Sequence, residues 1–452
     1  MRFAVHVQVV STIPVPQPPP LQGDNRLHYK AQDFLTENLG ENRFPTPLEL
    51  PDSFFASTRE RVLYCNTVGC SDGELDPEFS FERPGPFHRL HFDPAETNVG
   101  IVTCGGLCPG INDVIRSITY SSLDAYKVSK VYGFRHGFAG LARESPEIPI
   151  ELCHDVVHNI HEQGGTILGS SRGAQPIAEM VDTLVRYGIS ILFVIGGDGS
   201  HRGSMLMAEE VARRKLDIAV IGIPKTIDND ISHIQRSFGF DTAVEEARKA
   251  VNAAHVEATC LRNGIGLVKL MGRDAGFIAA HATLASGNVN ICLIPEEPFD
   301  LEVINQRIRR RLEKKGHLVI VVAEGVGQEF MRQGEKLEYD ESGNPRLIDI
   351  GPFLKKRISA YLKSAGIPFT IKYIDPSYMI RSTSANGIDS SFCLQLGNYA
   401  VHTGMAGRTN TLIGYWNQHF CLVPIHFALN EKKTVDINGS MWRSVLEVTG
   451  RY

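Results

Sequence analysis

An apolar run followed by a loop of glycines or acids recurs along this chain, and this repeat restricts the fold more than any other feature. Such runs begin at Val99, Ile189 and Ile218, and helical periodicity follows the first two loops. Continuous apolar runs of this length are typical of parallel strands buried on both faces. Their alternation with helices predicts a doubly wound α/β sheet with its ligand loops at the carboxyl ends of the strands.

The loop PKTIDND, residues 224–230, follows the third run and concentrates charge. Pro224 cannot continue a central ladder, so the strand is expected to end there. Lys225, Asp228 and Asp230 then place one cation and two carboxylates at the end of a buried strand. That placement costs free energy unless a ligand or a metal uses these groups. On this loop alone, a capped polar turn is the alternative.

The two earlier loops are rich in glycine and suit a phosphate. CGGLCPG at 104–110 precedes a helix expected over Asn112–Tyr126, so backbone N–H groups can approach an anion there. It lacks the Gly-Lys-Ser/Thr ending of a Walker loop, and a tight turn is the alternative. GGDGS at 196–200, with a helix expected from about Gly203, adds Asp198. This acid suits a metal-bound phosphate, or alternatively caps the helix.

The second half of the chain repeats the pattern with different loops. Its expected strand ends carry Arg273, Glu324, Tyr378 and Arg381. Arginines bind phosphate and a carboxylate binds hydroxyls, so this group suits a phosphorylated polyol. PKTIDND would lie between the two groups of loops, which is the arrangement that phosphoryl transfer requires. Asp228 can accept a hydroxyl proton there.

Composition excludes several other classes of protein. The 452 residues are enough for about two or three domains, and 42% hydrophobic with 21% charged residues is typical of a globular protein. A net charge of −5 without a long basic run gives no sign of nucleic-acid binding. No apolar run approaches the ~20 residues of a membrane helix. Nine scattered cysteines and no secretory signal predict free thiols in the cytoplasm.

Eight motifs occur in one order along the chain: CGGLCPGIND, SSRG, GGDGS, PKTIDNDI, SFGFDTAVEEA, LMGRDAGFIA, AEGVG and KYIDPSYMIR. Over roughly residues 95–430 the chain therefore resembles the 6-phosphofructokinases. The resemblance implies two Rossmann-like doubly wound domains with the active site in the cleft between them, plus an N-terminal extension. It also implies a cytoplasmic, allosteric homo-oligomer, usually a tetramer and alternatively a dimer.

The implied reaction is the committed step of glycolysis. ATP phosphorylates D-fructose 6-phosphate at its 1-hydroxyl, giving fructose 1,6-bisphosphate and ADP, with Mg²⁺ as cofactor. The implied domains are an N-terminal extension at 1–95, which we expect to wrap or dock on the main body, a nucleotide-binding domain at 96–240 completed by about 384–435, and a sugar-phosphate-binding domain at 241–383 with the C-terminal tail.

The same resemblance implies a role for individual residues. Asp228 is the general base on the 1-hydroxyl, Lys225 and Arg273 are catalytic, and Asp198 holds Mg²⁺ with help from Asp230. The nucleotide site is expected to comprise Gly105, Arg172, Gly173, Gly197, Asp198, Gly199 and Ser200. The sugar-phosphate site is expected to comprise Thr226, Ile227, Asp228, Met271, Gly272, Arg273, Glu324, Tyr378, Met379, Ile380 and Arg381.

The motifs give conflicting indications of the phosphoryl donor. Lys225, Lys372 and Tyr378 are typical of the pyrophosphate-using branch, whereas Gly199 is typical of ATP users, because pyrophosphate users usually have aspartate there. The combination resembles the longer ATP-dependent branch, which also has an N-terminal extension. The alternative is a pyrophosphate-dependent fructose 6-phosphate 1-phosphotransferase. A catalytically dead regulatory subunit is disfavoured, because the acids of both loops are present.

Lys225 allows two interpretations. Its ammonium can stabilise charge on the phosphoryl group during transfer. Alternatively, it pairs with Asp228 or Asp230 in the empty site and only holds the loop.

Overall fold

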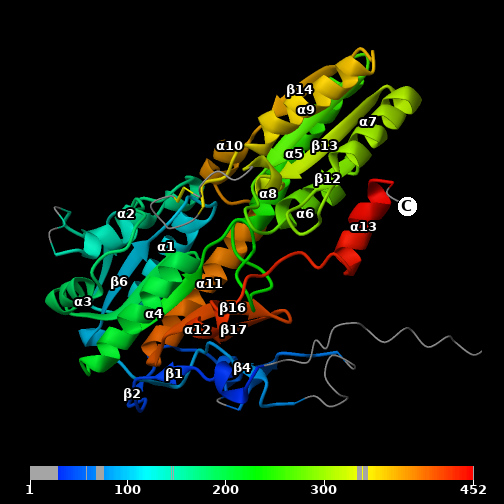
Figure 1. Cartoon of the computed structure of the whole chain (residues 1–452). Coiled ribbons are helices and arrows are strands. Elements are labelled where there is room, and N and C mark those ends of the chain that lie inside the picture. Colours follow the sequence, from blue (N-terminus) through cyan, green and yellow to red (C-terminus); the bar gives the residue numbers. More distant parts are fainter. Residues whose placement is uncertain are drawn as a thin grey trace, which may run out of the picture.

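Within the described residues, the strands form a nine-stranded sheet and a four-stranded sheet, called here the large sheet and the small sheet (Figure 1). This computed structural model describes residues 29–450, except for residues 58, 68–75, 144, 146, 333–337 and 340–344. The Pro-rich stretch near the start of the chain lies outside the described residues, as does part of the polar insertion expected at 328–349.

The large sheet has a parallel centre and antiparallel edges. Its strands lie in the order β3 (Arg61–Leu63), β4 (Ser80–Glu82), β17 (His419–Pro424), β16 (Thr411–Trp416), β10 (Ala219–Pro224), β9 (Ile189–Gly196), β6 (Asn98–Thr103), β7 (Lys130–Phe134) and β8 (Ile150–Glu151). The five strands from β16 to β7 are parallel, and the strands outside them pair antiparallel.

Helices cover both faces of the large sheet. One pair is α1 (Ile111–Tyr120) with α11 (Gly387–Met405), and the other is α3 (Ile177–Arg186) with α4 (Asp198–Arg213). Alternate residues of β9 pack into two separate cores, Phe193 with the first pair of helices and Val194 with the second. Each such side chain stabilises the fold by about 1.5–3 kcal/mol. The expected parallel strands, buried on both faces, are confirmed.

The small sheet is entirely parallel. Its strands lie in the order β12 (Ile291–Leu293), β13 (His317–Ala323), β11 (Gly264–Leu270) and β14 (Thr370–Ile374). The helices packed against it are α5 (Phe240–Thr259), α6 (Phe277–Ser286), α7 (Leu301–Lys315) and α9 (Ile350–Ser364). Helix α7 shows how its sequence sets both ends: the Asp300 carboxylate accepts from the Glu302 N–H at 2.7 Å, and Gly316 ends the helix in the left-handed conformation.

Several short elements complete the described chain. The helices are α2 (His154–Val157), α8 (Gln328–Met331), α10 (Ser377–Ser382), α12 (Ile425–Ala428) and α13 (Ser440–Val448), with a π-helical turn at Ser121–Ala125 and 3-10 turns at Ala31–Phe34, Asp52–Phe54, Pro94–Glu96, Gly137–Leu141 and Ile160–Glu162. Two small ladders pair β1 (Glu37–Asn38) with β15 (Arg408–Thr409) and β2 (Phe44–Pro45) with β5 (Arg89–Leu90). No helix of the described chain combines the length and the apolar character that crossing a membrane would take.

The described part of the N-terminal segment docks on the large sheet, as expected. Strands β3 and β4 extend the sheet beyond β17. Beside them, Phe34 and Phe427 lie 4.9 Å apart between ring centroids, and Tyr64 and Phe81 pack around the same rings. This aromatic cluster joins Phe34 to Phe427, which are almost 400 positions apart in the sequence.

Three expectations need correction. The helix after GGDGS begins at Asp198 and not near Gly203, because Gly197 takes the N-cap position and the whole acidic turn is helical. The segment expected as one strand end at Lys372–Arg381 is divided between β14 and helix α10. The expectation of free thiols is wrong for Cys65, which is disulfide-bonded.

Replacing Phe34 by alanine should lower the free energy of unfolding by about 3–5 kcal/mol, because its fully buried ring packs against five other aromatic rings. Urea and thermal unfolding measure the change. Phe54→Ala is the matched control, because that side chain is 64% exposed, and it should cost less than about 0.5 kcal/mol. Equal stabilities of the two variants would show that the N-terminal segment lies outside the folding core.

Candidate active site

A cleft of about 680 Å³ opens where β6, β9 and β10 end, and residues from the small-sheet side also line it. It brings together most of the predicted site residues: Gly105, Arg172, Gly173, Gly197, Asp198, Gly199, Ser200, Lys225, Thr226, Ile227, Asp228, Asp230, Arg273 and Arg381. The two groups of loops predicted to face each other therefore share one cavity, with PKTIDND between them.

Other predicted sugar-phosphate residues do not line this cleft, namely Met271, Gly272, Glu324, Tyr378, Met379 and Ile380. Met271 and Ile380 are buried in the hydrophobic core. Tyr378 and Met379 lie on the solvent side of α10, 86% and 75% exposed. Glu324 is nevertheless close enough that its charge helps to raise the pKa of Asp228.

The first glycine loop is fixed by its neighbour, the SSRG segment. The Gly105 N–H donates to the Ser171 carbonyl at 3.2 Å, and the Ser170 hydroxyl donates to the Gly105 carbonyl at 2.6 Å. Gly105 has a φ of +83°, where a side chain would be strained and would also meet the Lys225 ammonium at 3.7 Å. The contacts hold Arg172 at the edge of the cleft.

GGDGS forms the first turn of α4. Helical hydrogen bonding starts with the Ser200 N–H, which donates to the Gly197 carbonyl at 2.9 Å. The N–H groups of Asp198 and Gly199 therefore have no acceptor within the helix and lie at its positive end. A Cβ at Gly199 would meet nothing within 4 Å, so there is open space beside this turn. Such a turn can bind an anion.

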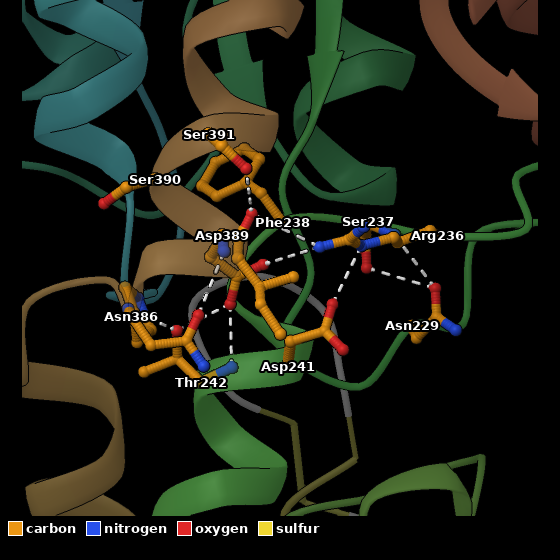
Figure 2. Close-up of polar contacts among 12 residues, drawn as sticks. Asn229, Arg236, Ser237, Phe238, Asp241, Thr242, Asn386, Asp389, Ser390 and Ser391 are labelled. Carbon is orange, nitrogen blue, oxygen red and sulfur yellow. Dashed lines mark hydrogen bonds and ion pairs between the residues drawn. The ribbon is translucent and has the colours of Figure 1, made fainter. Parts of the chain in front are cut away.

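PKTIDND is held in place by short hydrogen bonds. The Lys225 N–H donates to the Gly196 carbonyl at 2.8 Å, so the register of β9 and β10 continues into the loop. On the far side of the loop, the Ser237 hydroxyl donates to the Thr226 carbonyl at 2.6 Å. The Ser237 N–H donates to Asn229 Oδ1 at 3.0 Å (Figure 2). Asn229 has a φ of 56°, which asparagine tolerates better than most residues.

A buried carboxylate next to this loop ties the two sheet units together. Asp389, at the start of α11, accepts from the N–H and the hydroxyl of Thr242 at 2.7 and 2.6 Å, in the first turn of α5 (Figure 2). Arg236 forms an ion pair with Asp241 at 2.8 Å and lies 3.9 Å from Asp389. Because α11 packs on the large sheet and α5 on the small sheet, this joint fixes how the walls of the cleft meet.

Carboxylates crowd the floor of the cleft. Burial, with the charges of Asp230 and Glu324, raises the pKa of Asp228 to about 8. Burial and the Asp230 charge raise the pKa of Asp198 to about 6. One side-chain oxygen of Asp228 and one of Asp198 are buried without a hydrogen-bond partner. Buried like charges of this kind favour a bound cation.

These acids fit Mg²⁺ as part of a complex with phosphate. The described residues contain no group of three or more His, Cys, Asp and Glu side chains that could hold a metal alone. Mg²⁺ commonly takes one or two carboxylates and completes its shell with phosphate oxygens and water. The partnerless oxygen of Asp198 and the nearby Asp230 supply that smaller set.

Lys225 does not pair with the loop acids in this structure. Its side chain is almost fully buried, and its ammonium donates to the Gly106 carbonyl at 2.7 Å. Burial lowers the pKa of the Lys225 ammonium. Among the described residues it forms no ion pair with Asp228 or Asp230, so the interpretation of a loop-holding pair is wrong for the empty site.

Three charged residues that line the cleft, Arg202, Asp274 and Lys432, were absent from the sequence-based prediction. Asp274 directly follows Arg273, and the expected strand end in LMGRD could have identified it. Lys432 belongs to no motif and reaches the cleft from the C-terminal part of the chain. Only the folded topology brings it to the acids.

The chain matches the phosphofructokinase family over residues 98–403. Among curated proteins, it is 46% identical over 440 residues to the ATP-dependent 6-phosphofructokinase of Borreliella burgdorferi, covering 94% of this chain and 98% of that protein. It is 50% identical over 371 residues to the ATP-dependent 6-phosphofructokinase of Trypanosoma cruzi, covering 81% of this chain and 76% of that protein.

Solved structures share the fold at lower identity. The pyrophosphate-dependent phosphofructokinase of Marinobacter aquaeolei superposes with a TM-score of 0.65 at 20% identity, over 78% of this chain and 91% of that chain. The phosphofructokinase of Pichia pastoris in its T-state gives a TM-score of 0.62 at 20% identity, over 80% of this chain and 40% of that one.

Replacing Lys225 by methionine should change the free energy of unfolding by no more than about 1 kcal/mol, because a similar apolar chain replaces a buried ammonium that binds one carbonyl. Lys269→Met is the matched control. Its ammonium lies 3.3 Å from Asp349 and 2.8 Å from Asp375, so it should cost about 1.5–3 kcal/mol. Denaturant unfolding compares the two, and a larger loss in Lys225→Met would assign that lysine a structural role.

Proposed function

The chain belongs to the phosphofructokinase family, and on that premise we propose that it transfers a phosphoryl group from ATP to the 1-hydroxyl of D-fructose 6-phosphate. The products are fructose 1,6-bisphosphate and ADP, the committed step of glycolysis. The observation that carries this proposal is the position of PKTIDND, with Lys225 and Asp228 lining one cleft between glycine-rich turns and the arginines Arg273 and Arg381.

The nucleotide occupies the large-sheet side of the cleft in this proposal. The first turn of α4 and the loop at Gly105 supply backbone N–H groups for its phosphates, and Arg172 adds a positive charge at the edge. Gly173, Gly197 and Ser200 complete the lining. Asp198 and Asp230 hold Mg²⁺, which when bound neutralises charge on the phosphate oxygens.

Asp228 is the general base. It takes the proton of the sugar 1-hydroxyl as that oxygen bonds to the transferred phosphorus and the bond to the ADP oxygen breaks. A base works best with a pKa near the operating pH, and the pKa of Asp228, about 8, is close to neutral. Lys225 and Arg273 stabilise the charge on the phosphoryl oxygens in flight.

The sugar phosphate occupies the small-sheet side. Arg381 binds its 6-phosphate and Glu324 its hydroxyls, with Thr226, Ile227 and Arg273 lining the pocket and Met271 and Gly272 directly before Arg273 in the chain. Tyr378, Met379 and Ile380 of α10 take part only after the cleft closes, because they do not line it in the empty state.

ATP is the donor that the observations favour. Open space beside Gly199 leaves room for an inner phosphate of the nucleotide. Relatives at 46–50% identity are named ATP-dependent, whereas the pyrophosphate-dependent neighbour at 20% identity shares only the fold. A catalytically dead subunit is disfavoured by the acids that line the cleft.

The remaining parts of the proposal concern organisation. The extension is 1–95, the nucleotide-binding domain 96–240 with 384–435, and the sugar-phosphate-binding domain 241–383 with the tail. The enzyme acts in the cytoplasm as an allosteric homo-oligomer, a tetramer or a dimer.

A coupled assay with fructose 6-phosphate should show turnover with Mg²⁺ and ATP and little with pyrophosphate. Gly199→Asp should lose most ATP activity, since it places a carboxylate in the space beside the phosphates, where like charges repel. Gly387→Asp is the control, because that glycine also has open space around it and lies in the first turn of a helix, α11, but outside the cleft lining. Robust turnover with pyrophosphate and none with ATP would refute the proposed donor.

Asp228→Asn should lower kcat by about 10²–10⁴-fold, the usual loss on removing a general base, while the KM for fructose 6-phosphate changes much less. Asp241→Asn, which alters an acid of the joint outside the cleft lining, is the control for loss of a nearby negative charge. If kcat of Asp228→Asn stays within a few-fold of wild type, another group is the base.

A further inference from the structure

The C-terminal part of the chain crosses the cleft as a strap, defined here as residues 429–439. Helix α12 before it packs in the aromatic core beside the large sheet, and helix α13 after it packs against α6 beside the small sheet. Figure 1 shows the strap running from one sheet unit to the other. The strap therefore passes the mouth of the active site at the level of PKTIDND.

Backbone contacts fix the register of this strap. Lys432 forms an isolated antiparallel bridge with Ile231, and the Lys433 N–H donates to the Asp230 carbonyl at 3.0 Å. Further along, the Val435 N–H donates to Glu296 at 2.7 Å. The main chain at Lys432 and Lys433 is thus bound to the PKTIDND loop and to Ile231 after it, and the main chain at Val435 is bound to the small-sheet side. These contacts fix the direction of the Lys432 side chain.

Side chains hold the strap from the other flank as well. The carboxylate of Glu431 accepts from the Tyr29 hydroxyl at 2.8 Å and from the Ser232 hydroxyl at 3.3 Å. The Lys433 ammonium turns away from the cleft and donates to the Ile234 carbonyl at 2.6 Å. Of the two adjacent lysines, Lys432 alone therefore lines the cleft.

The Lys432 ammonium bridges acids from the two walls. It forms an ion pair with Asp274, which follows β11 of the small sheet, and lies 3.9 Å from Asp198, in the first turn of α4. The carboxylate of Asp230 is also close enough to attract the Lys432 ammonium. The side chain is 45% exposed, so the ammonium faces the open cavity and is not enclosed by protein.

We propose that Lys432 binds the polyphosphate group in the nucleotide site. The strap places this lysine at the cleft, and the ion pair with Asp274 orients its ammonium. This inference rests on the proposed function. In the empty site the ammonium offsets the charge of the crowded acids. When Mg²⁺ and nucleotide take over Asp198, Asp274 still accepts one N–H of the ammonium and holds it beside the phosphates, to which the other two N–H groups can donate.

A simpler role is that Lys432 only neutralises the acids until a metal arrives. The two roles predict different effects on nucleotide binding when Lys432 is removed. If the lysine only stood in for the metal, its removal would leave nucleotide binding unchanged or tighter in the presence of Mg²⁺, because a competitor is gone. If it binds phosphate, its removal weakens binding, most of all without Mg²⁺, when the acids would repel ATP.

The test compares Lys432→Met, Lys432→Gln and Lys432→Arg with wild type in the full chain. Calorimetry measures ATP binding with Mg²⁺ and with EDTA, and steady-state kinetics gives kcat and the KM for ATP. Both neutral variants should weaken ATP binding in the presence of Mg²⁺ by about tenfold or more, the loss of one charge-assisted contact, and the loss should be larger in EDTA. The KM for ATP should rise with kcat within a few-fold, and arginine should restore most of the affinity.

Lys249→Met is the matched control, because that ammonium forms the same kind of double contact, 2.6 Å from Glu246 and 3.9 Å from Glu245, on the surface of α5. It should leave ATP binding unchanged. Unchanged or tighter ATP binding by the neutral Lys432 variants in the presence of Mg²⁺ overturns the inference. If wild type binds ATP but does not phosphorylate fructose 6-phosphate, the proposed function fails while the binding comparison still decides the role of Lys432. Wild type that binds no ATP overturns both.

Discussion

Parallel pairing of β6, β9 and β10 is the constraint on which the rest of the structure depends. Thr103 pairs with Ile195, and Ile195 pairs with Ile223, so the three strands end at one level. Polar groups cannot be buried in such a ladder without partners, and they gather where it stops. The glycine turns, the acidic turn and PKTIDND are neighbours for this reason, although about 120 residues separate the first from the last, as 225 − 105.

Much of this arrangement could be predicted from the sequence because it follows from local pattern. Apolar runs identified the central strands, and the residues directly after them identified the glycine turns, Asp198 and the charged groups of PKTIDND that line the cleft. Helix α4 begins earlier than expected. The three glycines in GGDGS weaken helix propensity, but the N-cap at Gly197 and the packing of the helix outweigh that cost. Lys432 could not be predicted, since nothing local indicates that residue 432 meets Asp198 and Asp274.

The cleft combines groups that would be unfavourable singly. A lysine almost out of contact with water faces a carbonyl at 2.7 Å, and two carboxylates carry oxygens without partners. Rigid supports hold them: Ser237 beneath the loop and Asp389 at the joint accept or donate at 2.6–3.0 Å. Groups held ready in this way need little rearrangement when charge develops on a ligand, which is the main advantage of a preorganised site. Tyr378 and Met379 lie outside this rigid part and are exposed.

The order of strands in the large sheet has a consequence for the growing chain on the ribosome. Strand β10 ends at Pro224, but its neighbour β16 begins only at Thr411, and the whole small sheet is translated between them. Domains usually fold as they emerge, amino-terminal part first. Here the large sheet is begun first but completed last. Until β16 is made, the apolar edge of β10 stays open to wrong pairing. That edge therefore needs protection while residues 225–410 are translated, before the strand that covers it exists.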